Sequence, residues 1–275
     1  MTATLDLRKA RRITGTSRAE LKRAIGARES RLRPIVRHAM AQMAARLTRP
    51  ELRHAWAMGG QAHAGLVAAA RQAWTDAIPA LVAALAAPLQ KQDELLPTTA
   101  QQLAEREIGA LIRDLADRQL LAVQAQLAAL MDQGPSDAVL GAIARATGLT
   151  ANQTAAVGRF VAAQLSSGAS EQTALRAAET YADRLLAQRA QLIARTEAVR
   201  YTSQLVLERG ADVGGIVVKQ WVSARDENVD AICRALDNDE RIPLEQPFTA
   251  FGLEFQGPPA HPGCRCVPEI WRVDA

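Results

Sequence analysis

A chain of 275 residues has room for one large domain or two of ordinary size. Its hydrophobic fraction is 48% and its aromatic fraction only 4%, so any core must consist mainly of Ala, Leu, Val and Ile, a composition that favours long helices. Residues 1–7 contain no apolar signal segment, and the most apolar window, residues 78–89, is too short to span a bilayer. We therefore expect no membrane partner, and a chain kept in a reducing cytoplasm or in a particle assembled there.

The net charge of +4 conceals an uneven distribution along the chain. Residues 1–55 carry 14 Lys and Arg against 4 Asp and Glu, or +10, whereas the remainder carries −6. A basic segment suggests a phosphate backbone or an acidic protein surface as partner. A solvated helix face explains the same charges, because no aromatic residues interleave them for base stacking. The basic side chains that we expect at such a contact are Arg8, Lys9, Arg11, Arg12, Arg18, Lys22 and Arg23.

The N-terminal half has the pattern of a helical region behind a basic arm. Residues 1–16 are expected to be flexible, and the capping box Ser17–Glu20 predicts the start of a helix that runs to about Thr48. Pro34 predicts a kink or a break in this helix. Apolar residues continue at helical spacing to residue 130, which predicts further helices.

The C-terminal half changes from helix to a mixed structure. The capping box Thr150–Gln153 starts one helix, Gly168 ends it, Ser170 starts the next, and Gly210 is predicted to end the last helix. Residues 214–222 are β-branched and aromatic, which predicts a strand, and repeated Pro and Gly after it predict turns.

We therefore predict an α+β chain with a long, mainly helical N-terminal region and a small α+β C-terminal module. The predicted domains are a flexible basic arm (1–16), a helical region (17–190) and the small module (191–275).

Four side chains near the C-terminus have the chemistry of zinc ligands. Cys233, His261, Cys264 and Cys266 supply three thiols and an imidazole, the groups that structural zinc prefers in a tetrahedron. Pro262-Gly263 predicts a turn that could bring His261 and Cys264 inward together. A metal would hold together a small unit with little core. The alternative is two buried small hydrophobes and one surface thiol. Asp230 stands where a Cys-x-x-Cys pair would place its first thiolate, so it is an alternative ligand or a turn residue.

Other positions suggest structural roles rather than catalysis. Arg195 and Glu197 are two apart on a helix, so they face different partners and are either anchors for the loops of the small module or ordinary surface charges. Trp221 is expected in the core of the module. No Ser-His-Asp arrangement, Walker loop or GxGxxG motif is present, so we predict that the chain is not an enzyme. The alternative is a metal-dependent nuclease or toxin-like enzyme, for which Glu254 and Glu269 are the nearest carboxylates.

Four features in this order resemble a known family. They are Ile193–Glu197 (IARTE), a Trp-bearing strand, Cys233–Asp237 after an acidic turn, and the closing Pro259–Cys266. Together they resemble the phage head morphogenesis family, the Mu F-like minor head proteins, over residues 150–270. Many members carry a Cys or His pair where this chain has Asp230 and Cys233, which puts a four-thiolate site in doubt.

The resemblance implies a minor structural protein of a tailed-phage head that is incorporated with the portal during procapsid assembly. Its implied partners are the portal protein and the major capsid protein, with double-stranded DNA as a further partner during packaging or delivery. It implies several copies per virion, in the head near the portal vertex, and assembly in the host cytoplasm. It also implies a structural zinc or a close cysteine–histidine cluster, and it makes Arg195 and Glu197 anchors between the last helix and the small module.

Overall fold

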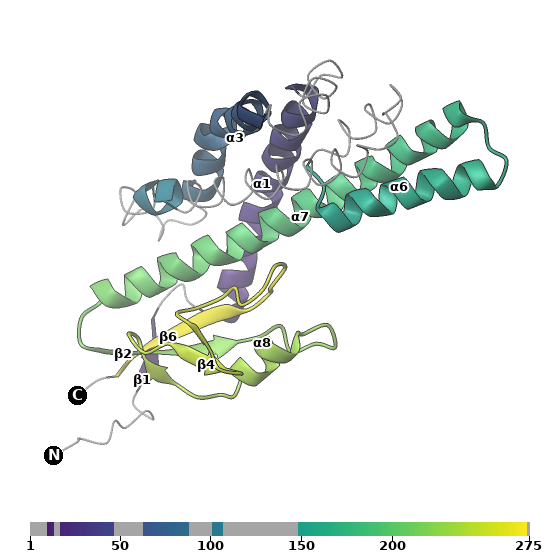
Figure 1. Cartoon of the computed structure of the whole chain (residues 1–275). Coiled ribbons are helices and arrows are strands. Elements are labelled where there is room, and N and C mark those ends of the chain that lie inside the picture. Colours follow the sequence, from purple (N-terminus) through teal and green to yellow (C-terminus); the bar gives the residue numbers. More distant parts are fainter. Residues whose placement is uncertain (1–9, 14–16, 47–62, 88–100, 107–147, 274–275) are drawn as a thin grey trace. The chain divides into compact units, whose positions relative to one another are not determined.

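The computed structural model describes residues 10–13, 17–46, 63–87, 101–106 and 148–273 (Figure 1). The chain separates into two compact units that do not follow the order of the sequence. The first unit combines residues 1–33 and 83–104 with residues 192–275, and the second combines residues 34–82 with residues 105–191. The expectations for residues 1–9 and for helices within 107–147 lie outside the described part of the chain.

Helices contribute to both units. Helix α1 spans Arg18–Arg46 and begins at the predicted capping box, because the Ser17 backbone N–H donates to Glu20 and the Glu20 N–H donates to the Ser17 hydroxyl. The helix is continuous through Pro34, so the predicted alternative of a break is wrong. Helix α3 spans His63–Ala86 and likewise continues through Pro79. None of the helices in the described ranges has both the length and the apolar character needed to cross a bilayer.

Two further helices precede the small module. Helix α6 spans Ala151–Ser166 behind a complete Thr150–Gln153 capping box, and helix α7 spans Glu171–Asp212, so the break predicted at residues 168–170 is confirmed. Gly210 does not end α7 as predicted, because it lies inside the helix. A β-carbon there would lie 3.2 Å from Leu244 and 3.3 Å from Ile270. The glycine therefore permits close packing of α7 on the sheet.

The C-terminal module contains a four-stranded antiparallel sheet with strand order β1-β6-β2-β3. Its strands are β1 (Ala10–Arg12), β2 (Ile216–Val222), β3 (Ile242–Pro243) and β6 (Val267–Val273). The predicted strand at residues 214–222 is confirmed, and so is the α+β class. The prediction of a flexible arm is wrong for residues 10–12, because these residues form strand β1 and pair with residues 271–273 of β6.

The core of the module lies beside the central strand β2. Trp221 is fully buried and makes edge-to-face contacts with Phe248 and Phe255, whose ring centroids lie 5.4 and 6.1 Å away. These two phenylalanines come from the two-stranded hairpin of β4 (Phe248–Ala250) and β5 (Leu253–Phe255). Short helix α8 (Ala231–Leu236) adds Leu236 to the same apolar cluster. All three cysteines of the chain belong to this cluster, so the three predicted thiol ligands are part of the core.

One buried cation ties β2 to the segment after the hairpin. The Lys219 ammonium is fully buried and donates to the Gln256 backbone carbonyl at 2.9 Å and to its side-chain oxygen at 3.2 Å. It also lies 5.0 Å from the Phe248 ring centroid. Burial lowers the pKa of Lys219 to about 8, with Glu245 opposing the change. These contacts hold residue 256 near the start of the loop that carries the predicted ligands.

Candidate metal centre

A tight turn positions two of the predicted ligands. His261, Pro262, Gly263 and Cys264 form a β-turn closed by the Cys264 N–H donating to the His261 carbonyl at 3.2 Å. Pro at the second position and a positive φ of 77° at Gly263 are the requirements of a type II turn. The turn therefore brings the His261 ring and the Cys264 thiol to one side, as the Pro-Gly sequence predicted.

Cys233, His261 and Cys264 form a compact cysteine–histidine cluster. One ligand atom from each lies within 4.8 Å of the other two, although the three residues are up to 31 positions apart. The Cys233 and Cys264 sulfurs are 3.7 Å apart and both thiols are free. Two sulfurs bound to one tetrahedral zinc at 2.3 Å would lie about 3.8 Å apart. The geometry of the two thiols therefore fits zinc without rearrangement.

The space beside the cluster also fits a single ion. A cavity of about 20 Å³ is lined by Cys233 and His261 of the cluster, by Cys266 and Asp230 and by five further residues, but not by Cys264. A volume of this size holds one water-sized particle. The His261 Nδ1 lies 2.9 Å from the Pro262 carbonyl. A proton on Nδ1 donated to that carbonyl would leave Nε2 free to bind a metal. Two thiols and an imidazole thus lie close together, and two of these three side chains, Cys233 and His261, border a space for one ion.

The thiols are electrostatically coupled. Hydrogen bonding from Cys233, then from Cys266, lowers the pKa of Cys264 despite its burial. The pKa of Cys233 is raised, first by its hydrogen bond to Cys264 and next by that to Cys266. One thiolate at Cys264 is therefore stabilised by its neighbours. A group of sulfurs that already favours a thiolate is suited to a cation, because the thiolate is the form that binds metals.

The remaining predicted ligands border the cluster. Cys266 is buried, lines the cavity and lies outside the group of three. Hydrogen bonding with Cys233 lowers the pKa of the Cys266 thiol, but Cys264 and burial outweigh it and raise the pKa overall. The nearby Trp221 indole N–H is buried without a hydrogen-bond acceptor. A Cys266 thiolate would give this N–H an acceptor. Asp230 lines the cavity, and its carboxylate caps α8 by accepting the Ile232 N–H at 3.0 Å.

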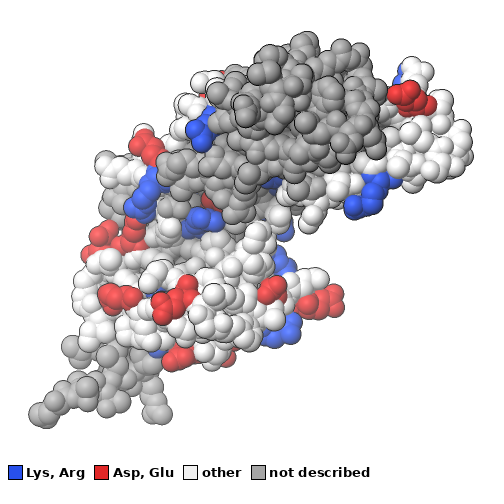
Figure 2. Space-filling model, in the orientation of Figure 1, with Lys and Arg blue, Asp and Glu red and all other residues white. Residues whose placement is uncertain are grey.

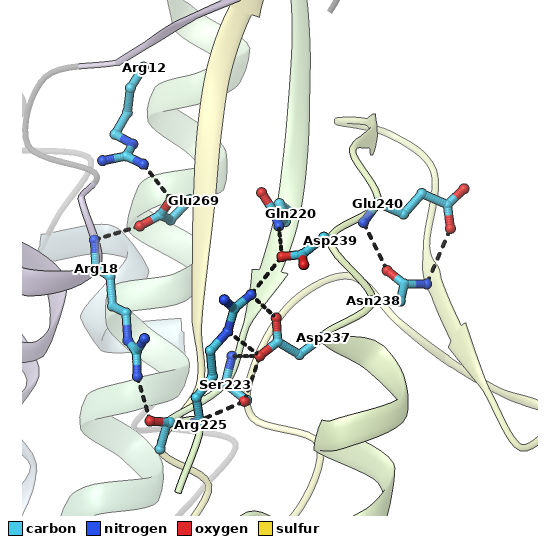
Figure 3. A network of polar contacts seen from close by, with 11 residues as sticks. Arg12, Arg18, Gln220, Ser223, Arg225, Asp237, Asn238, Asp239, Glu240 and Glu269 are labelled. Atoms are coloured by element: carbon cyan, nitrogen blue, oxygen red, sulfur yellow. Dashed lines mark hydrogen bonds and ion pairs between the residues drawn. The ribbon is translucent and has the colours of Figure 1, made fainter.

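Salt bridges fix the loops around the cluster. Arg265 donates twice to Asp226, at 2.6 Å each, which ties the Cys264–Cys266 segment to the acidic turn. Figure 3 shows a second network in which Asp237 accepts from Arg225 and from the Ser223 backbone and hydroxyl. Arg225 also reaches Asp239 at 2.6 Å. The sequence showed the acidic turn at Asp226-Glu227, but it did not show that arginines pair with the carboxylates around the cluster.

The IARTE segment contacts the cluster through a residue that sequence reasoning missed. The Thr196 hydroxyl accepts the Gly263 N–H at 2.9 Å and donates to the Leu192 carbonyl at 2.7 Å. A β-carbon at Gly263 would lie 2.7 Å from Leu192. The glycine and the threonine therefore dock the ligand-bearing turn directly on α7.

The two predicted anchors have other partners. Arg195 forms a two-pronged ion pair with Glu29 of α1, at 3.1 and 3.2 Å, rather than with a loop of the C-terminal module. Glu197 is buried and lies 3.5 Å from Arg200 of the same helix. Thr196 stands between them in the sequence and contacts the turn. Its two charged neighbours were the more obvious candidates, so the sequence did not point to Thr196.

The contacts of Thr196 lead to a first prediction. The substitution Thr196→Val conserves shape but leaves the Gly263 N–H without its acceptor, so we expect a loss of about 1–2 kcal/mol in stability. Because a displaced turn misplaces two ligands, zinc affinity should fall by roughly 10-fold. Thermal unfolding and competition with a chelator measure the two effects. Thr180→Val is the matched control, since the Thr180 hydroxyl bonds only to the Arg176 carbonyl within α7. Equal behaviour of the two variants would contradict the role of Thr196.

The basic residues predicted to contact DNA or the portal divide into two groups. Arg12 forms an ion pair with Glu269 at 3.0 Å, and Arg18 donates its N–H to the same carboxylate at 2.7 Å and its guanidinium to the Ala224 carbonyl (Figure 3). Lys22 and Arg23 are exposed on α1, and Arg11 is exposed on β1. Arg8 and Lys9 lie outside the described residues.

The charge on the visible surface is mixed. Figure 2 shows acidic and basic side chains interspersed over the described part of that face. The basic side chains therefore do not form one continuous patch there. The carboxylates of the enzymatic alternative do not belong to the cluster: Glu269 accepts from Arg12 and Arg18, and Glu254 lies exposed on the β4–β5 hairpin.

Comparison with known proteins gives one match. A family model described as phage Mu protein F like protein matches residues 121–269, which is more than half of the chain. The matched range includes α6, α7 and the module with its cysteine–histidine cluster, whereas β1 and α1 precede it. A search of curated proteins and a search of solved structures each found no match.

Proposed function

Because the chain belongs to the phage Mu protein F like family, a family of phage head morphogenesis, we propose that it is a minor structural protein of a tailed-phage head. It is incorporated with the portal during procapsid assembly and lies in the head near the portal vertex, in several copies. The family match over the module and its cluster is the observation that carries this proposal. The helical region, residues 17–190, supplies the docking surface for the portal and the major capsid protein, and the small module (191–275) is a compact accessory to it.

Co-purification tests the assembly role. The chain, expressed with the portal protein and the major capsid protein of the same phage or prophage, should co-sediment with the procapsids and remain with the portal after the shells are dissociated. Procapsids that form at normal yield and contain portal but not this chain would contradict the proposal.

We assign a structural zinc to the cysteine–histidine cluster. Cys233, His261 and Cys264 are the ligands that already lie together, and Cys266 on the border of the cavity is the fourth. Zinc would supply bonds that cross-link α8 to the loop before β6 and would perform no reaction. The burial of the thiols in an apolar core supports a structural rather than a catalytic site, since a catalytic zinc needs a position open to substrate.

A contact with packaged DNA is assigned to the exposed face of α1. Lys22, Arg23 and Arg33 are exposed there, and Lys22 and Arg33 lie within about 20° of each other at 100° per residue. The two acidic residues of the helix are already engaged, Glu20 with Ser17 and Glu29 with Arg195. Burial first, then repulsion by Arg18 and Arg265, lowers the pKa of Lys22, so two arginines lie near enough to add to its positive charge.

The DNA contact predicts a measurable salt dependence. Replacing Lys22, Arg23 and Arg33 together by glutamine should reduce the slope of log affinity against log salt by about 2–3 for a double-stranded fragment, because each phosphate contact contributes about 0.9. Fluorescence anisotropy at several salt concentrations measures the slope. A double control, Arg159→Gln with Arg176→Gln, removes exposed arginines from α6 and α7. An unchanged slope in the α1 variant would contradict this contact.

A further inference from the structure

The tip of the β4–β5 hairpin exposes two large apolar side chains. Phe251 is 73% exposed and Leu253 is 54% exposed, which makes them the two most exposed large hydrophobics among the described residues. Single exposed apolar residues are common on protein surfaces. Two adjacent ones at the end of a projecting turn form a small apolar knob, here called the hairpin tip (Phe251 and Leu253).

The backbone at the tip is unfavourable for phenylalanine. Ala250 pairs directly with Leu253, so the loop has two residues, Phe251 and Gly252, with φ of 52° and 77°. Positive φ at both positions is the requirement of a type I′ turn, which strongly prefers Asn-Gly or Asp-Gly. A bulky residue in this conformation is an outlier because its β-carbon crowds the backbone. Phe251 therefore stabilises the isolated chain neither through its conformation nor through burial.

The base of the hairpin holds the tip rigidly. Phe248 and Phe255 are opposite one another in the hairpin, and both rings pack against the buried Trp221. The exposed knob is thus a short extension of the module core. A side chain presented in a fixed orientation loses little freedom on binding, which favours its use as an anchor in a protein interface.

The charges around the tip indicate the kind of partner. Residues 242–264 contain no Lys or Arg, and the exposed Glu254 directly follows Leu253 on β5. Nucleic acid and anionic lipid surfaces would be repelled by this carboxylate. A convex apolar knob with an acidic neighbour is complementary to an apolar pocket with a basic rim on another protein.

We propose that the hairpin tip inserts into an apolar, basic-rimmed pocket of another head protein. This inference rests on the proposed function, and it assigns a specific contact residue to it. The occupied pocket would bury Phe251 and Leu253, while Glu254 would meet the cationic rim.

Two substitutions separate binding from folding. Phe251→Asn places the preferred Asn-Gly pair in the turn, so it should raise the melting temperature by ~2 °C or more while weakening binding at least 10-fold. Leu253→Gln removes the second apolar side chain without changing the turn and should also weaken binding. Leu165→Gln, an exposed apolar position on α6 in the other compact unit, is the matched control. The probes are the purified portal protein and, separately, the major capsid protein, with affinity measured by interferometry and oligomeric state by light scattering.

Each outcome decides the inference. Weaker binding of Phe251→Asn and Leu253→Gln to one of the two probes, with Leu165→Gln unchanged, supports it. Equal binding by wild type and both tip variants overturns it and leaves the proposed function intact. Self-association of the wild type that the tip variants abolish assigns the tip to a second copy and overturns the stated partner. Failure of the wild-type chain to bind either probe contradicts the proposed function, and the inference with it.

Discussion

Replacing Cys264 with serine is expected to abolish zinc binding and to destabilise the C-terminal module by several kcal/mol. The Cys264 sulfur is central to the cluster: it lies 3.7 Å from Cys233, and its pKa is lowered by hydrogen bonds from Cys233 and then from Cys266. Without it, the site retains one thiol and one imidazole of the assembled set, too few for a closed structural zinc. Metal binding in such sites is coupled to folding, so the loss should appear as unfolding.

Elemental analysis and thermal unfolding measure these two effects. Wild-type protein purified in reducing buffer should hold about one zinc per chain, and a chelator should lower its melting temperature to that of Cys264→Ser. The variant Cys266→Ser removes the assigned fourth ligand and should also lose zinc. Zinc retained with reduced stability would instead make Cys266 a core residue only. Full zinc content in Cys264→Ser would contradict the assigned site.

The Asp237→Asn substitution is expected to cost about 2–3 kcal/mol of stability. The Asp237 side chain is only 6% exposed and accepts from Arg225, the Ser223 N–H and the Ser223 hydroxyl (Figure 3). An asparagine keeps one oxygen but turns an amide N–H toward these donors, so partly buried groups lose their acceptor. Asp239→Asn is the matched control, because Asp239 also bonds Arg225 but is 74% exposed. It should cost less than about 1 kcal/mol.

The same carboxylate predicts a pH dependence. Burial raises the pKa of Asp237, but hydrogen bonds from Arg225 and Ser223 outweigh it and lower the pKa below 3.8. A lowered pKa in the folded state contributes stability above the unfolded value and loses it as the pH falls through the folded value. Wild type should therefore lose more stability than Asp237→Asn as the pH falls below about 4, as measured by denaturant unfolding. Parallel curves for the two proteins would contradict the role of this network.

Local signals in the sequence predicted much of the helical framework and the position of the ligand turn. Ser17, Thr150 and the Pro262-Gly263 pair act on neighbours within four residues, so their effects are visible in the sequence alone. Each of these predictions is confirmed by the hydrogen bonds of the structure.

Predictions that depend on distant partners failed or were missed. Residues 10–12 were assigned to the flexible basic arm 1–16, but they form a strand because they pair with residues some 260 positions away. Gly210 was interpreted as a helix stop, whereas its role is the close approach of Leu244 and Ile270. Thr196 has no distinguishing local pattern, and its importance depends on the Gly263 N–H. Tertiary contacts decide each of these cases, and a single sequence does not display them.

The most direct test of the proposed function is the protein content of purified heads. Particles from an induced prophage that carries this gene should be treated with nuclease, separated on a density gradient and analysed by quantitative mass spectrometry against the portal protein. The proposed function predicts the chain in the head fraction, at a fixed ratio to portal and in several copies per particle. Its absence from infectious, DNA-filled heads that contain the normal amount of portal would contradict an assignment as a structural head component.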